Sequence, residues 1–147
     1  MRIGAIVCGL FLSLLATAQV RASDQLSGVY NLHLFFGDTK PFLDELTIKV
    51  DEKGKIGGQM HVPGDFDAEL EGITTEGSMG VTKLSFFVSL PDKYHKAFGN
   101  RLFYELHFLS RSPFTIDYKE QFAGFVTHHK TEYRPTYVGS VVGFRKE

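Results

Sequence analysis

The chain has 147 residues, with 16 basic and 17 acidic side chains and a formal net charge of −1. That length suits one domain, and the lack of a basic excess argues against nucleic acids or anionic membranes as partners. The 14 Phe and 6 Tyr, with no Trp, fit a pleated sheet and an aromatic core.

Residues 1–22 have the features of a secretory signal peptide. Arg2 supplies the positive end, an apolar run follows, and small residues lead up to two cleavage sites. We expect cleavage after Ala18 or Ala22, which leaves a single domain over residues 23–147. The apolar run is short for a bilayer and no stop-transfer pattern follows, so we expect no transmembrane segment after cleavage.

The only cysteine, Cys8, lies inside this apolar run and would leave with the signal peptide. An exported domain without cysteine fits a bacterial periplasm better than a eukaryotic extracellular space. We therefore expect a secreted protein, either periplasmic or extracellular, whose core alone stabilises it.

Apolar and polar side chains alternate in eight stretches of the mature chain, and a period of two predicts β-strands. The expected strands cover residues 28–36, 42–50, 56–62, 66–73, 82–90, 101–110, 121–129 and 136–145. Residues 74–80 are expected to be a loop, 91–100 a connection with one helical turn, and 114–120 a strand or an extended crossover. This spacing predicts an all-β fold, a single antiparallel up-and-down barrel of about eight strands, with a two-sheet β-sandwich as the alternative.

The hairpin loops set the register of the second to fourth strands. The segment DEKGK fits a three-residue loop with Gly54 in the left-handed conformation, which pairs Leu46 with Met60. A three-residue loop at PGD then pairs Met60 with Ala68. A slip of one residue would turn every side chain over, so we expect these three residues to form one inward layer.

Gly28-Val29-Tyr30 opens the first strand and Arg145 closes the last. This pattern resembles the calycins, such as lipocalins and avidins, in which Gly-x-Trp near the start packs beneath a basic residue of the last strand. Tyr30 stands where that family has Trp. The resemblance implies a barrel that holds a ligand, and biotin binding is not carried over because the chain has no tryptophan to line such a site.

The inward-facing aromatic side chains are the candidate ligand site. An eight-stranded barrel is just wide enough to be filled by side chains or to hold one small ligand. The first hypothesis is that the lumen binds a small, mostly apolar molecule without catalysis. The candidate lining residues are Tyr30, Phe66, Phe86, Tyr104 and Phe108.

The second hypothesis is a protein-interaction or structural module with a filled core. If Phe86 pairs with Tyr104, then Phe87 meets Phe103 on the outer face, with Leu109 further along it. Contiguous apolar surface there would serve a protein partner or self-association into a homo-oligomer.

An enzyme is the third hypothesis, but no nucleophile elbow or phosphate loop occurs, so we assign no catalytic residue and expect no cofactor. The register also places His61 between Glu45 and Asp67 on the outer face. We interpret these three as a surface charge cluster, with a weak Zn²⁺ site as the alternative. Outer charges such as Lys49 and Glu69 favour a soluble barrel over one embedded in lipid.

Overall fold

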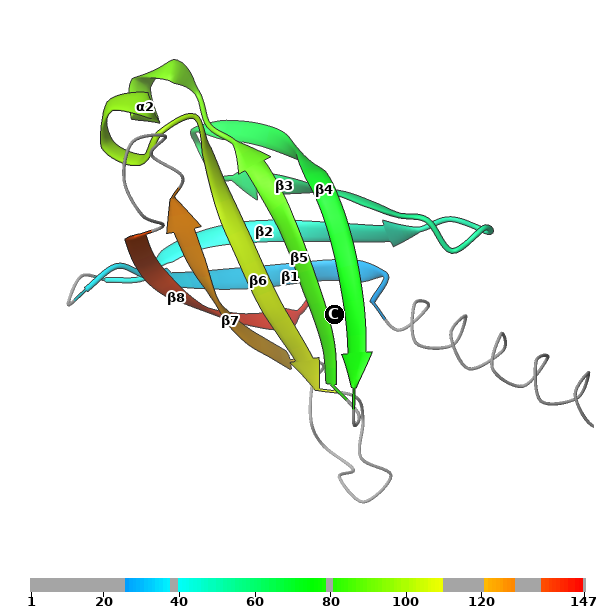
Figure 1. Ribbon diagram of the computed structural model, residues 1–147. Coiled ribbons are helices and arrows are strands. Elements are labelled where there is room, and N and C mark those ends of the chain that lie inside the picture. Colours follow the sequence, from blue (N-terminus) through cyan, green and yellow to red (C-terminus); the bar gives the residue numbers. More distant parts are fainter. Residues whose placement is uncertain (1–25, 38–39, 79–80, 110–120, 129–135, 147) are drawn as a thin grey trace, which may run out of the picture.

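The computed structural model describes residues 26–37, 40–78, 81–109, 121–128 and 136–146, which form a single closed barrel. Each strand pairs antiparallel with its neighbours in sequence, and β8 pairs with β1 to close the sheet (Figure 1). This arrangement confirms the predicted up-and-down barrel over the sandwich. The elements are β1 (Gly28–Phe35), β2 (Phe42–Val50), β3 (Ile56–Val62), β4 (Phe66–Ser78), β5 (Val81–Ser89), α2 (Asp92–Phe98), β6 (Arg101–Leu109), β7 (Gln121–His128) and β8 (Thr136–Arg145).

The longest strand, β4, corrects one prediction. Residues 74–78 were expected in a loop because they are polar and glycine-rich, but they continue β4 and pair with β5, from Thr74 opposite Ser85 to Ser78 opposite Val81. A register shift after Glu71 and a positive φ of 59° at Gly72 mark a bulge in the strand. Backbone pairing with β5 therefore extends the strand, and this pairing cannot be recognised from the pattern of side chains.

The connection between β5 and β6 holds α2, a helix of 7 residues where a single turn was expected. It ends at Phe98 and is followed by Gly99, whose φ of 79° only glycine adopts readily. No helix in the described ranges is long and apolar enough to cross a membrane. The expected signal peptide with its cleavage sites and residues 114–120 lie outside the described residues.

The β2–β3 loop has the predicted geometry. Gly54 has φ +77°, and its N–H donates to the carbonyl of Asp51 at 2.9 Å. The Asp51 carboxylate accepts hydrogen bonds from the backbone N–H groups of Lys53 and Lys55, at 2.9 and 2.8 Å. The predicted pairs Leu46 with Met60 and Met60 with Ala68 are confirmed.

We expect Gly54→Ala to lower the free energy of unfolding by about 1 kcal/mol, because an L side chain at positive φ is strained. An added Cβ would meet no atom within 4 Å, so the effect is conformational rather than steric. Gly57→Ala is the matched control, since its Cβ also meets nothing within 4 Å and its φ is not positive. Urea unfolding should separate the two variants; equal stabilities would contradict the assigned turn.

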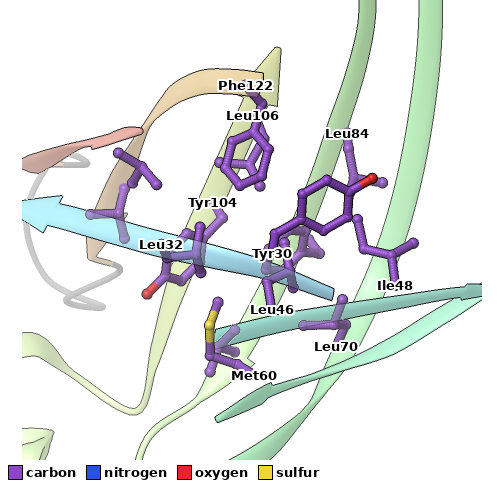
Figure 2. Close-up of a cluster of buried hydrophobic side chains, with 14 of the residues drawn as sticks. Tyr30, Leu32, Leu46, Ile48, Met60, Leu70, Leu84, Tyr104, Leu106 and Phe122 are labelled. Carbon is purple, nitrogen blue, oxygen red and sulfur yellow. The ribbon is translucent and has the colours of Figure 1, made fainter. Parts of the chain in front are cut away.

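The buried side chains form one cluster inside the lumen. Figure 2 shows Tyr30, Leu84, Leu106 and Phe122 gathered in this cluster from four different strands. The fully buried residues are Tyr30, Phe86, Phe122, Leu32, Leu46, Ile48, Met60, Leu84, Leu106, Val88, Val126 and Val141.

Two side chains form hydrogen bonds with the backbone just before β1, at the end of the barrel where β1 begins. The Tyr30 hydroxyl donates to the carbonyl of Leu26 at 3.0 Å, and Nη2 of Arg145 donates to the carbonyl of Ser27 at 2.6 Å. A Cβ on Gly28 would lie 2.9 Å from Nε of Arg145, so glycine lets the guanidinium lie against the backbone. A closed eight-stranded antiparallel barrel is compatible with the calycin arrangement.

Candidate ligand cavity

The other end of the barrel contains a cavity of about 630 Å³, a size typical of small-molecule sites. It lies where β1 ends and β6 begins, beneath α2. Most of its described lining is apolar, and Asp44 and Asp65 are the charged residues in it. The lining residues are Leu34, Phe36, Phe42, Asp44, Val62, Pro63, Asp65, Phe66, Leu90, Tyr94, Phe98, Leu102 and Tyr104. The lumen is therefore filled at one end and hollow at the other.

Aromatic rings form a nearly continuous collar around the mouth. Phe36 contacts Phe42 edge to face, with ring centroids 5.4 Å apart, and also contacts Phe98 at 6.4 Å. Tyr94 lies between Phe98, at 6.5 Å, and Phe66, at 6.1 Å. The collar presents ring faces and edges from β2, β4, α2 and Phe36, which directly follows β1, to one space.

The helix α2 is attached to the rim mainly through Asp65, in the turn between β3 and β4. Lys93 Nζ and the Tyr94 hydroxyl both donate to the Asp65 carboxylate, and these hydrogen bonds hold the pKa of Asp65 below its ordinary value. None of the residues of α2 is buried. The helix therefore covers the mouth with half-buried side chains, and its Phe98 packs against the core.

Asp44 is the unexpected polar group of the cavity. It lies on β2 two residues before Leu46, so its side chain faces the lumen, and its backbone pairs with Leu32. Burial raises the pKa of Asp44 to about 6; nearby His61 opposes this rise and Asp65 adds to it. Among the described residues, no side chain or backbone group forms a hydrogen bond with the Asp44 carboxyl.

Tyr104 stands beside Asp44 at the floor of the cavity. Its ring stacks on Phe86, with centroids 5.2 Å apart and planes 8° from parallel. Burial raises the pKa of the Tyr104 hydroxyl, and the negative charge of Asp44 adds to this effect. Figure 2 shows the hydroxyls of Tyr30 and Tyr104 pointing in opposite directions along the lumen. In the described part of the chain the Tyr104 hydroxyl has no hydrogen-bond partner, so it remains available to a ligand.

No protein-family model, curated protein or solved structure matches this chain. Its function is therefore inferred from the cavity itself.

Asp44→Asn is expected to stabilise the protein at pH 8 and to have little effect at pH 4. A carboxyl whose pKa rises from 3.8 to about 6 on folding opposes folding once it is ionised. The destabilisation is absent below the unfolded pKa, grows between the two values and is complete above the folded one. Because solvent reaches the mouth, we expect about 1–2 kcal/mol at pH 8 rather than the full value of the shift. Urea unfolding of both proteins at the two pH values tests this; an effect of equal size at both would contradict it.

The five predicted lumen residues divide between the two halves of the barrel. Phe66 and Tyr104 line the cavity, as expected for ligand contacts. Tyr30 and Phe108 pack with Phe122 in the filled half, at centroid distances between 4.6 and 5.6 Å, and Phe86 lies behind Tyr104.

Sequence analysis missed Asp44 and the aromatic residues of α2. For Asp44 the signal was present, because it falls in the same alternating series as Leu46 and Ile48 and so had to face inward. For Tyr94 and Phe98 there was no such signal, because nothing in a polar connection shows that it folds back over the barrel mouth.

The predicted outer aromatic pair is present on β5 and β6. Phe87 pairs with Phe103, with ring centroids 5.0 Å apart, and the Arg101 guanidinium lies 4.7 Å from the Phe87 ring centroid. Both rings are half-buried within the protein itself, and the side chain of Leu109 lies outside the described residues. Self-association through this face stays a prediction.

The Glu45–His61–Asp67 cluster forms only in part. Both cross-strand pairs have the predicted register, and His61 Nδ1 lies 2.5 Å from Asp67 Oδ1. Glu45 instead accepts a hydrogen bond from Lys146 Nζ at 2.7 Å. Across the described residues, no three His, Cys, Asp or Glu side chains gather closely enough to hold a metal ion. Lys146 engages Glu45 in place of His61, and Zn²⁺ binding at this cluster stays a prediction.

Proposed function

We propose that this chain is an exported, non-catalytic binding protein that holds a small, mostly apolar molecule in the open half of its barrel. The observation that carries the proposal is the cavity of about 630 Å³ beneath α2, lined mainly by apolar and aromatic side chains. Such a surface is costly to leave in water and favours an apolar occupant.

The likeness to calycins supports the same function. The closed barrel and the contact of Arg145 with the backbone at Gly28 match the arrangement by which the chain resembles calycins. A shared fold is a weak guide to function, so the cavity carries the greater weight. The likeness adds that barrels of this kind bind their ligands inside the lumen.

A neutral apolar dye, N-phenylnaphthylamine, tests the proposal directly. Its fluorescence should rise with saturation at one site per chain. Val62→Trp fills the cavity from β3 and should weaken the affinity about tenfold or more, because the dye and the indole compete for the same space. Lys49→Trp, on the exposed face of β2, is the matched control and should bind as the parent does.

Native mass spectrometry of the chain purified under mild conditions should also show a retained small molecule. Equal dye affinity in both Trp variants, or no saturable binding to the parent, would overturn the proposal. In either case the cavity would not be the binding site.

A further inference from the structure

The charges around the cavity narrow the kind of molecule that fits it. Among the described residues, the lining contains two carboxylates, Asp44 and Asp65, and no lysine, arginine or histidine. Asp65 is already neutralised by Lys93 of α2. Asp44 has no cationic partner within salt-bridge distance among the described residues, so it leaves a net negative charge inside an otherwise apolar space.

The aromatic collar has the same electrostatic preference. Six of the lining residues carry aromatic rings: Phe36, Phe42, Phe66, Tyr94, Phe98 and Tyr104. Ring faces attract cations through their quadrupole, and most strongly where water is excluded. An anionic head group would meet these ring faces and two carboxylates, with no cation among the described lining residues.

We propose that the ligand is an amphipathic cation, a protonated amine or quaternary ammonium joined to an apolar body, with its nitrogen seated between the Asp44 carboxylate and the aromatic collar. The apolar body then lies along Leu34, Leu90 and Leu102. The proposal rests on the proposed binding function and adds the charge of the ligand to it.

The cation also resolves the unfavourable position of Asp44. A half-buried carboxylate without a partner is costly, and a bound cation supplies both charge and contact. In the described structure, the charged or titratable groups that act on Asp44 are His61 from β3, Asp65 from the β3–β4 turn and Tyr104 from β6. Lys93 and Tyr94 of α2 instead bind the Asp65 carboxylate. None of them forms a hydrogen bond with the Asp44 carboxyl, so Asp44 stays available to a cation.

Three molecules with the same alkyl chain test the proposal by calorimetric titration of the intact chain. Octyltrimethylammonium is the cation, octanol the neutral molecule and octanoate the anion. At pH 8 we expect the cation to bind about tenfold or more tightly than octanol, and octanoate to bind more weakly than either.

Asp44→Asn should remove the preference for the cation over octanol. Glu69→Gln, which removes the same charge from the exposed face of β4, is the control and should keep the preference. Between pH 8 and pH 5 the parent should lose cation affinity as Asp44 gains a proton. Asp44→Asn should lose much less cation affinity over the same pH range. Any contribution of His61, Asp65 and Lys93 is common to both proteins, so the difference between them measures the effect of Asp44.

The ligand series in the parent protein decides the matter even if a variant folds poorly. Octanol binding as tightly as the cation, or octanoate binding more tightly, would overturn the cationic ligand while leaving the apolar cavity in use. Failure of all three to bind would overturn it as well, and the N-phenylnaphthylamine titration then decides whether the cavity binds anything. Loss of cation affinity in Glu69→Gln equal to that in Asp44→Asn would also overturn it, because general surface charge would then explain the preference.

Discussion

Replacing Tyr30 with Ala should lower the free energy of unfolding by about 3–5 kcal/mol, the largest effect that we expect from a single substitution here. The side chain is 0% exposed and lies edge to face with Phe108 and Phe122, at centroid distances of 5.6 and 5.5 Å. Its removal leaves a cavity between β1 and the strands β6 and β7. These strands cannot move inward to fill it, because the closed barrel fixes their distance from β1. Urea unfolding followed by far-ultraviolet circular dichroism measures the loss.

Tyr30→Phe is the matched control. It keeps the ring contacts and removes only the hydroxyl that donates to the carbonyl of Leu26, so it should cost about 1 kcal/mol. If the alanine variant lost no more stability than the phenylalanine variant, packing of the Tyr30 ring would not be what holds this half of the barrel together.

Gly143→Ala should destabilise the protein by about 1–3 kcal/mol through overpacking. A Cβ at this position would lie 2.0 Å from Cζ of Phe122, a distance that no relaxed structure tolerates. The Phe122 ring is enclosed by Tyr30 and by Phe108, so it cannot shift without moving them. Thermal and urea unfolding should both record the loss.

Two further variants separate overpacking from a general effect of losing glycine. Gly77→Ala on β4 meets no atom within 4 Å and should cost little. Combining Gly143→Ala with Phe122→Leu should cost less than the sum of the two single changes, because the smaller side chain makes room for the new methyl group. Strict additivity would show that the two positions do not compete for space.

Alternation and loop length together predicted most of the fold. The alternating pattern placed Leu46 and Met60 on the inner face, and the three-residue loop at Gly54 left only one register that kept them there. The same logic correctly paired Phe86 with Tyr104. It failed for residues 74–78, where hydrogen bonding to β5 rather than the side-chain pattern decides the conformation.

The candidate site was less predictable than the fold. The alternation of side chains along the strands showed that Phe66 and Tyr104 face inward. It did not show whether the space around them is filled or empty. That depends on the volumes of side chains from all eight strands and on where α2 lies, and no local pattern contains this information. Asp44 is the exception, since one carboxylate in an inward apolar series indicates a polar function by itself.

The topology described above also has a consequence for the route by which the chain folds. Every pair of neighbouring strands is close in sequence except β1 and β8, which join residues such as Tyr30 and Arg145 across almost the whole domain. Hairpins close short loops at small entropic cost, whereas this seam closes a loop of more than a hundred residues. We therefore expect a curved open sheet to form first and the β1–β8 seam to close late, so that the rate of folding is limited by the meeting of the chain's two ends.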